Sequence, residues 1–386
     1  MTKISRTTDM TQGSEMRHII MFSLPLLAGN LLQQTYNIVD TMVVGRYLGD
    51  DALAAVGATG SITYLFYTLC IGLSVGAGII VAQYFGAGKQ KALRSAVFNS
   101  ALVTAIFGVV ISLLSVPAAR PILELLKVPD KLIGDSAVYM QIACGGTIAV
   151  AAYNWINAIM RALGDSKTPL IFLGAASLLN ALLDLLFVVV FKFGIAGAAW
   201  ATVLTQALSA ISCIVYCFAV SGEIKLTADD LHADKDMMSR CVKTGVPIAI
   251  QNGLISVSMV ALQRVTNGFG ETVMAAYTVS MRIEQFVQQP FSSLNAAVST
   301  FTGQNIGAGK EKRAQKGLAC AIKISVIFSA VVLVLFTLFG GAITSWFVKG
   351  KTVISISAKA LIITSLFYWS LGIIPVSYTH LTLPTT

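Results

Sequence analysis

Long apolar runs alternate with short polar stretches along nearly the whole chain. Each run reaches about 20 residues, the length that an α-helix needs to cross a bilayer. The runs lack the alternating polarity of β-barrel strands, so the pattern predicts an all-α polytopic membrane protein. Ten spans are expected, at 18–44, 52–82, 93–117, 133–160, 168–191, 194–219, 242–264, 274–303, 317–340 and 353–375.

The polar loops that follow the second and eighth predicted spans are near copies of each other. Gln83–Lys89 reads QYFGAGK, and Gln304–Lys310 reads QNIGAGK 221 residues later; one gap away, Pro25 pairs with Pro247. A duplicated set of hydrophobic helices is typical of secondary transporters, which bind substrate between the repeats. Six spans precede the polar stretch 221–243, so the second half begins on the same side of the membrane. The sequence therefore predicts two pseudo-symmetric six-helix lobes.

The second half of the repeat ends early. Arg161–Pro169 (RALGDSKTP) follows the fourth span, and its counterpart is expected near residue 382. The chain instead closes with 376–386 (VSYTHLTLPTT), which has neither a basic loop nor two further spans. We therefore expect a C-terminally truncated second lobe, with about ten of twelve helices present, and a non-native tail.

Composition and charge fit a membrane protein. Hydrophobic residues make up 55% of the chain and charged residues 12%, whereas charged residues are about a quarter of soluble proteins. With the N-terminus inside, the loops on that side carry 16 Lys and Arg residues against 8 on the other side. This bias predicts a cytoplasmic N-terminus in the inner (plasma) membrane. It also explains the net charge of +9 without nucleic-acid binding.

The expected organisation follows from the spans and their orientation. It comprises a cytoplasmic tail (1–17), an N-lobe (18–220), a cytoplasmic inter-lobe linker (221–243), a partial C-lobe (244–375) and the non-native tail (376–386). The six cysteines and three histidines show no spacing of a metal site or disulfide framework, so we expect no cofactor.

The first predicted span carries a polar face that ends in a carboxylate. Gln33, Asn37 and Asp40 follow one another at helical spacing, and Tyr36 lies one turn before Asp40. A carboxylate inside a bilayer costs about 2.5–3.5 kcal/mol on insertion scales, so such residues usually act on ions, protons or substrate. Pro25, in the same span, permits a hinge.

The fifth span contains the other buried carboxylate. Asn180 and Asp184 share one face of this helix, and Thr202 lies at a similar depth in the sixth span. Carboxylate, amide and hydroxyl oxygens suit a hard monovalent cation, and a carboxylate alone can carry a proton. A structural hydrogen-bond network is the alternative reading.

Weaker candidates for a substrate cavity lie in other spans. Asn154 and Asn157 occupy the fourth span, and Gln251, Glu284 and Gln288 occupy the seventh and eighth. Together with Gln33, Tyr36 and Asn37 they form the predicted lining.

These residues resemble the multidrug and toxic compound extrusion (MATE) family. The resemblance covers about residues 15–375 and rests on Pro25, the run Asp40–Gly45, the Gln83–Lys89 loop, the Arg161–Pro169 stretch, and Asn180 with Asp184. It implies two six-helix lobes around a central cavity and export of organic cations and amphipathic compounds in exchange for H⁺ or Na⁺. In the DinF-like branch, the coupling positions are matched here by Asp40, Asn180, Asp184 and Thr202.

The resemblance thus implies a cation-coupled antiporter that works by alternating access and is not an enzyme. Its expected partners are small amphipathic or cationic substrates and the lipid bilayer, with no nucleic acid, and we expect a monomer. No metal is expected apart from Na⁺ at the coupling positions. A lipid-linked oligosaccharide flippase of the same superfamily is the alternative, although few basic residues lie within the spans to bind its pyrophosphate. An intramembrane enzyme lacks a visible catalytic set, and a passive channel does not explain an asymmetric carboxylate site that lies in one lobe only.

Overall fold

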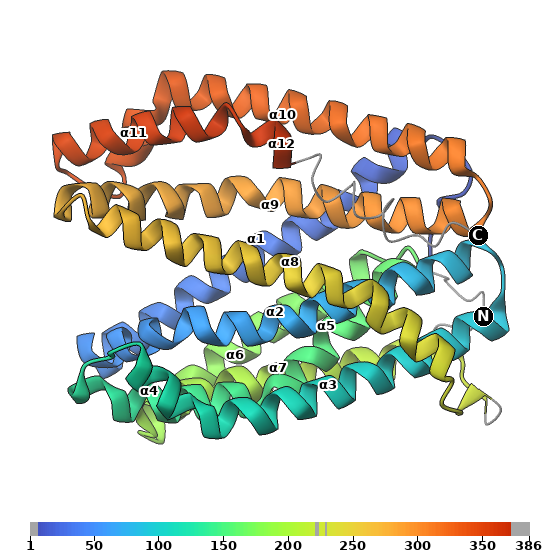
Figure 1. The fold of residues 1–386 in the computed structure, drawn as a ribbon, viewed down its shortest axis with the longest axis horizontal. Coiled ribbons are helices and arrows are strands. Elements are labelled where there is room, and N and C mark those ends of the chain that lie inside the picture. The colour runs from blue at the N-terminus through green and yellow to red at the C-terminus, as the bar shows by residue number, and fades with distance from the viewer. Residues whose placement is uncertain (1–6, 221–223, 228–229, 372–386) are drawn as a thin grey trace. The chain divides into compact units, whose positions relative to one another are not determined.

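A computed structural model describes residues 7–220, 224–227 and 230–371 of the chain (Figure 1). Every regular element in these ranges is helical, which confirms the predicted all-α class. The elements are α1 (Glu15–Leu48), α2 (Asp50–Gly86), α3 (Gln90–Leu125), α4 (Asp130–Gly145), α5 (Thr147–Ala162), α6 (Lys167–Asp184), the π-helical turn η1 (Leu185–Val190), α7 (Gly194–Val220), α8 (Lys235–Asn267), α9 (Glu271–Gly307), α10 (Glu311–Ser345), α11 (Lys351–Ser365) and α12 (Tyr368–Leu371).

Helices cover the ten predicted spans as far as residue 371, with one clear correction. The expected single helix over 133–160 is a pair, α4 and α5, which meet at a 43° bend. A Cβ atom on Gly146, at the bend, would lie 2.3 Å from the Val203 side chain of α7, so this close approach requires glycine. In the described part of the chain, six helices are long and apolar enough to cross a membrane, or seven if the bent pair is one span. Helices α1, α9 and α11 fall outside those six.

The contacts divide the chain into two compact units, each described here by itself. Unit 1 comprises Met1–Asp9 and Leu32–Leu254, and unit 2 comprises Met10–Leu31 and Ile255–Thr386. The divisions fall inside helices α1 and α8. The lobe boundaries expected from the sequence, after residues 17, 220 and 243, stay predictions, and the predicted tail 376–386 lies outside the described residues.

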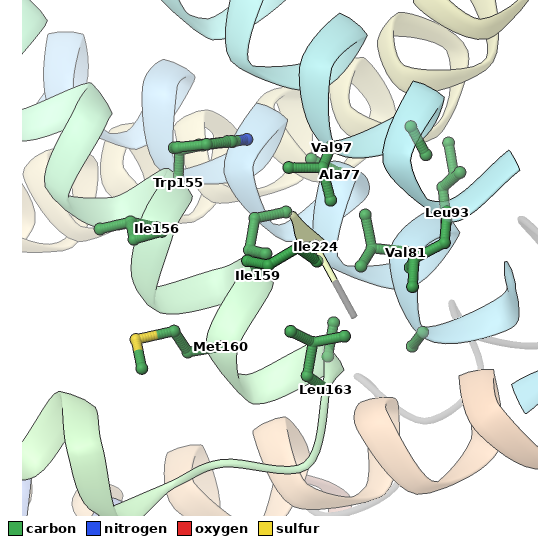
Figure 2. Packing of buried hydrophobic residues seen from close by; sticks show 14 of the residues in the cluster. Ala77, Val81, Leu93, Val97, Trp155, Ile156, Ile159, Met160, Leu163 and Ile224 are labelled. Carbon is green, nitrogen blue, oxygen red and sulfur yellow. The ribbon is translucent and has the colours of Figure 1, made fainter. Parts of the chain in front are cut away.

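Unit 1 packs α2 against α3, α4 and α5, and α7 against α5 and α6. Figure 2 shows part of its main apolar core, in which the labelled side chains come from α2, α3, α5 and the linker. Trp155 places its indole in this core and donates its Nε1–H to Ser100 Oγ at 2.9 Å, so the buried polar atom has a partner. Ile224 of the linker is fully buried in the same core, which attaches the linker to unit 1.

The first half of α8 belongs to unit 1 because glycines allow it to approach α2 closely. A Cβ on Gly72 would lie 2.5 Å from the Ala249 backbone, and one on Gly76 would lie 2.6 Å from the Gly245 backbone. Small residues permit such backbone contact between membrane helices, where van der Waals packing holds helices together. This crossing fixes residues 235–254 to unit 1.

The Arg161–Pro169 stretch builds the turn between α5 and α6. Asp165 is buried, and its Oδ1 accepts hydrogen bonds from the backbone N–H groups of Lys167 (3.1 Å) and Thr168 (3.0 Å). Its Oδ2 accepts the Thr168 hydroxyl at 2.6 Å. The carboxylate therefore satisfies free donors of the first turn of α6, where a negative charge is favoured.

Unit 2 is built mainly from α9, α10 and α11, which all pack on one another. Ser280 of α9 and Ser357 of α11 form a buried hydrogen bond of 2.9 Å. Asn30, in the first half of α1, donates from Nδ2 to Ser293 Oγ of α9 at 3.0 Å. Through this bond and its apolar neighbours, the first half of α1 packs into unit 2.

Candidate functional site

Two carboxylates meet inside unit 1. Asp40 lies in the second half of α1, and Asp184 is the last residue of α6. Their side chains lie within hydrogen-bond reach of each other. Asp184 is 0% exposed, whereas Asp40 is half-buried and its Oδ1 is buried. Two carboxylates share a hydrogen bond only when one of them holds a proton, so this geometry suits a site that takes up a proton or a cation.

The oxygens of this pair have few protein partners. Both carboxylate oxygens of Asp184, Oδ1 of Asp40 and Oδ1 of Asn180 are buried without a hydrogen-bond donor, and Nδ2 of Asn180 is buried without an acceptor. Asn180 lies one turn before Asp184 on the same face of α6 and is 1% exposed. Burying a polar group without a partner is costly, and burying an unpaired charge is more so. These oxygens therefore form a ready set of ligands for a cation or proton.

Tyr36 and Thr202 complete the polar cluster. The side chains of Tyr36 in α1 and Thr202 in α7 hydrogen-bond to each other, and Tyr36 lies close to both carboxylates. Helices α6 and α7 pack side by side, as the sequence predicted for the partners of Asp184. The structure thus brings the predicted coupling residues together with Tyr36, which was assigned to the substrate cavity.

The backbone changes its helical form directly after Asp184. The turn η1 is π-helical, and such turns are rare and frequently found at functional sites. Helix α7 packs tightly on this turn, because a Cβ on Gly197 would lie 3.1 Å from Phe187. The hydrophobic pattern of residues 168–191 contains no sign of this change of helical form.

Tyr139 of α4 was missed by sequence reasoning. Its hydroxyl group interacts electrostatically with Asp40, Asp184 and Tyr36. In the sequence it stands between Val138 and Met140 in an apolar helix, where a tyrosine has no distinguishing pattern. Only the packing of α4 in unit 1 reveals its place beside the carboxylates.

The remaining predicted cavity residues lie in several environments. Asn154 donates to the Val150 carbonyl of its own helix at 2.8 Å. Asn157 is buried, bonds to Tyr153 and keeps Oδ1 without a partner. The cavity roles of these residues, and of Gln33, Asn37 and Gln251, stay predictions. Gln33 and Asn37 are exposed, whereas Gln251 is half-buried.

Glu284 and Gln288 belong to unit 2, so they are described apart from the carboxylate pair. The hydroxyls of Thr364 and Tyr368 lie within hydrogen-bond reach of the Glu284 carboxylate of α9. Tyr368 packs in an aromatic cluster, with its ring 6.2 Å from that of Phe291. The described residues contain no group of three or more His, Cys, Asp or Glu side chains arranged to hold a metal ion.

Known proteins share both the sequence pattern and this architecture. The profile of the MatE family matches residues 25–186 and 247–382. The Bacillus subtilis protein named "Probable multidrug resistance protein YoeA" is 31% identical over 373 residues, which cover 95% of this chain and 81% of that protein. A second protein of that organism, "Probable multidrug resistance protein YpnP", is 29% identical over 367 residues, which cover 95% of this chain and 82% of its own length.

Solved structures agree on the fold. An outward-facing multidrug resistance MATE family transporter superposes with a TM-score of 0.88 at 22% identity, over 97% of this chain and 86% of that one. A MOP superfamily transporter from Pyrococcus furiosus gives a TM-score of 0.85 at 23% identity, over 97% and 87%. At this identity the likeness concerns the fold alone.

The fold and the comparisons define a multi-pass helical membrane protein whose relatives are transporters rather than enzymes. The chain belongs to the MatE family.

Proposed function

We propose that this protein is a multidrug efflux transporter that exports small amphipathic or cationic molecules across the plasma membrane. The names of its relatives in Bacillus subtilis support export of drugs. A Staphylococcus saprophyticus relative named "Multidrug export protein MepA", 23% identical over 330 residues, supports the same substrate class. The excess of basic residues in alternate loops supports a cytoplasmic N-terminus.

Export is driven by entry of H⁺ or Na⁺ at Asp40, Asp184, Asn180 and Thr202. The observation that carries this proposal is the buried carboxylate pair with unpartnered oxygens. No ion pair found among the described residues includes either aspartate, so a bound cation or proton supplies the missing positive charge. This scheme requires no cofactor, because the ion is a transported substrate.

The coupling step is a change in hydrogen bonding around the pair. Ion binding neutralises Asp40 and Asp184 and alters their interactions with Tyr36. Helix α1 then bends near Pro25, which lacks the N–H needed for a regular helical hydrogen bond. The bend narrows the drug pocket and releases drug outward, and the inward-facing state releases the ion and rebinds drug. A ligand moves such an equilibrium only by binding the two states differently.

The test is drug efflux by variants of the two carboxylates in cells that lack other exporters. Asp40→Asn and Asp184→Asn remove the titratable charge with little change of shape, and we expect both to abolish efflux while the protein stays folded. Asp51→Asn is the matched control, because Asp51 belongs to the same unit but is exposed and pairs with Lys131 at 2.6 Å. Normal efflux by either of the first two variants would contradict the proposal.

A further inference from the structure

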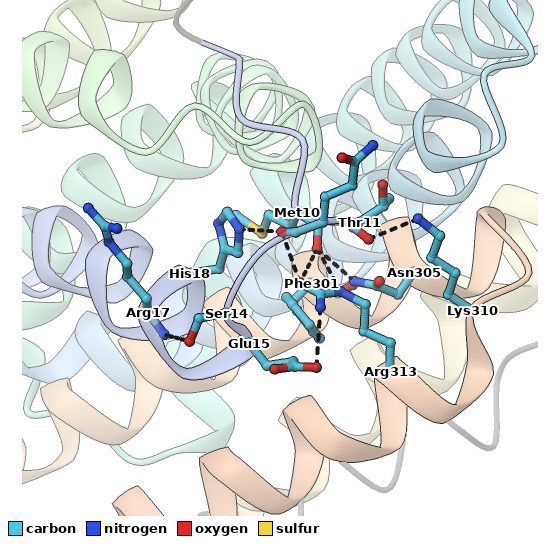
Figure 3. Close-up of polar contacts among 11 residues, drawn as sticks. Met10, Thr11, Ser14, Glu15, Arg17, His18, Phe301, Asn305, Lys310 and Arg313 are labelled. Carbon is cyan, nitrogen blue, oxygen red and sulfur yellow. Dashed lines mark hydrogen bonds and ion pairs between the residues drawn. The ribbon is translucent and has the colours of Figure 1, made fainter.

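The segment before helix α1 is attached to unit 2 by a dense set of polar contacts (Figure 3). We call Met10–Glu15 the N-terminal anchor. The backbone N–H of Met10 donates to Gln304 Oε1 at 2.9 Å, and its carbonyl accepts from Asn305 Nδ2 at 3.2 Å. Two neighbouring side chains of α9 thus bond to the N–H and the carbonyl of the Met10 backbone.

Two basic side chains at the start of α10 bind the rest of the N-terminal anchor. Lys310 Nζ donates to the Thr11 carbonyl at 2.9 Å. Arg313 donates from Nη2 to the carbonyls of Met10 (3.2 Å) and Gln12 (3.0 Å), and its Nη1 pairs with Glu15 at 3.2 Å. Hydrogen bonds from charged donors are the strong ones, and the fork of a guanidinium fixes several acceptors at once.

Burial strengthens the attachment. Met10 is 1% exposed and packs in one apolar cluster with Ile19 of α1 and Phe301 of α9. The guanidinium carbon of Arg313 lies 5.4 Å from the centre of the Phe301 ring, within the range of a cation–π contact. The anchor and the first turns of α1 are therefore part of the core of unit 2.

The repeated loop recurs in the other unit, where it meets a different segment. Gln304, Asn305 and Lys310 belong to the loop that copies Gln83–Lys89. In unit 1, Tyr84 of the first copy accepts a hydrogen bond from Arg240 Nη1 of α8 at 3.1 Å. Asn99, within α3, binds the linker that precedes α8: its Oδ1 accepts from the backbone N–H of Asp234 at 2.8 Å, and its Nδ2 donates to the His232 carbonyl at 3.3 Å. Unit 2 thus holds the segment that precedes α1, and unit 1 holds the segment that precedes α8. Both of these helices are divided between the units.

Helix α1 begins at the end of the N-terminal anchor and contains Asp40. Its residues up to Leu31 belong to unit 2, and those from Leu32, including Tyr36 and Asp40, belong to unit 1. A structural change at Asp40 reaches unit 2 through this helix only while the first half stays attached. A helix end that frays from unit 2 would absorb the bend near Pro25 instead of transmitting it.

We infer that Arg313, Asn305 and Gln304 are positioning residues of ion-coupled transport: they hold the N-terminal anchor so that the first half of α1 moves as part of unit 2. The inference rests on the proposed function above. These residues touch neither ion nor drug. Their loss leaves ion binding at unit 1 intact and uncouples it from drug movement.

The first experiment separates binding from coupling in purified protein reconstituted into liposomes. We expect Arg313→Gln to keep cation binding in unit 1, measured with ²²Na⁺ or as proton uptake, and to lose ion-driven drug transport by about tenfold or more. Lys316→Gln is the matched control, an exposed cation one turn further along α10. Unchanged transport in Arg313→Gln would overturn the inference, and so would a parallel loss of cation binding.

The second experiment restores the attachment by chemistry. Gln12→Cys/Arg313→Cys lacks the guanidinium and should be uncoupled, and joining the two thiols with a short bis-maleimide should bring drug transport back. Gln12→Cys alone, treated with the same reagent, controls for links to Cys320, since the other five native cysteines are buried. If the linked protein does not transport, the anchor either must detach in each cycle or does not act through attachment, and the inference is wrong.

Failure of this inference is distinguishable from failure of the proposed function. If Asp184→Asn abolishes transport while Arg313→Gln does not, the proposed coupling site is supported and the inference about the N-terminal anchor is wrong. If Asp184→Asn transports normally, the proposed coupling falls whatever the anchor does.

Discussion

Units 1 and 2 contain copies of one repeat, yet the carboxylates within their helices are partnered in opposite ways. In unit 1, Asp40 and Asp184 meet with oxygens that have no donor. In unit 2, the hydroxyls of Thr364 and Tyr368 lie within hydrogen-bond reach of Glu284. A satisfied carboxylate has little to gain from binding an ion, whereas an unsatisfied pair has much to gain. The comparison teaches that two copies of one repeat can share a frame and still differ in how their carboxylates are partnered, and our proposal assigns ion binding to the unpartnered pair.

A second contrast between the units lies in the packing of α8 and α1, the two helices that are divided between them. In unit 1, α8 crosses α2 at Gly72, where the backbones touch. The position 221 residues after Gly72 is Ser293, which accepts a hydrogen bond from Asn30 of α1. Equivalent crossings are thus held by close backbone packing in one unit and by a side-chain hydrogen bond in the other.

The largest predicted effect tests the carboxylates directly. We expect Asp184→Asn to lower ion-driven drug transport on the order of 100-fold, the upper range of coupling free energies, and Glu284→Gln to lower it less than about fivefold. Transport rates in proteoliposomes, at equal protein content, check both. Equal losses in the two variants would remove the functional difference between the units.

A backbone change ranks second and concerns two of the positive-φ glycines at helix ends. Gly164 (φ 81°) in unit 1 has the backbone of Thr8 2.2 Å from a Cβ position, whereas Gly309 (φ 71°) in unit 2 has open space. Replacing Gly309 by Ala should cost about 1–2 kcal/mol of backbone strain. Gly164→Ala should cost about 1–3 kcal/mol more, because the methyl group also displaces Thr8. Thermal unfolding in detergent measures the difference, and similar Tm values for the two variants would contradict the contact between Thr8 and Gly164.

The helix crossings give the third prediction. Gly72→Ala pushes α8 away from α2 and should destabilise unit 1 by about 1–3 kcal/mol. Ser293→Ala removes the acceptor of Asn30 and the local bond from Ser293 Oγ to the Gln289 carbonyl, and the lost bond to Asn30 should cost about 0.5–1.5 kcal/mol. Gly57→Ala, in a helical position with nothing within 4 Å of the new methyl group, should be neutral or stabilising and serves as the control. A larger loss for Ser293→Ala than for Gly72→Ala would reverse the contrast.

The smallest effect is expected at the surface. Lys131 and Asp51 form an ion pair of 2.6 Å with side chains 74% and 64% exposed. Exposed pairs contribute roughly 0–1 kcal/mol, so Lys131→Ala should leave Tm nearly unchanged. A marked fall in Tm would contradict this prediction, because it would show that the ion pair contributes more to stability than exposed pairs do.

Much of this architecture could be predicted from local patterns in the sequence. The features that could not be predicted depend on packing between distant residues. A carboxylate in an apolar span is visible in the sequence, so Asp40 and Asp184 were found, and their meeting followed from helix packing. The bend at Gly146 and the π-turn after Asp184 leave the hydrophobic pattern unchanged and were not foreseen. Contacts such as Met10 with Gln304 join residues 294 apart, which no periodicity reports.

The most direct test of the account is ion movement driven by drug. Wild-type protein in proteoliposomes, given an outward drug gradient, should move H⁺ or Na⁺ in the opposite direction, and the ion that moves identifies the coupling cation. The account predicts that Asp184→Asn shows no such counter-movement although it still binds drug. Drug-driven ion movement that persists in Asp184→Asn would contradict the assignment of coupling to the carboxylate pair of unit 1.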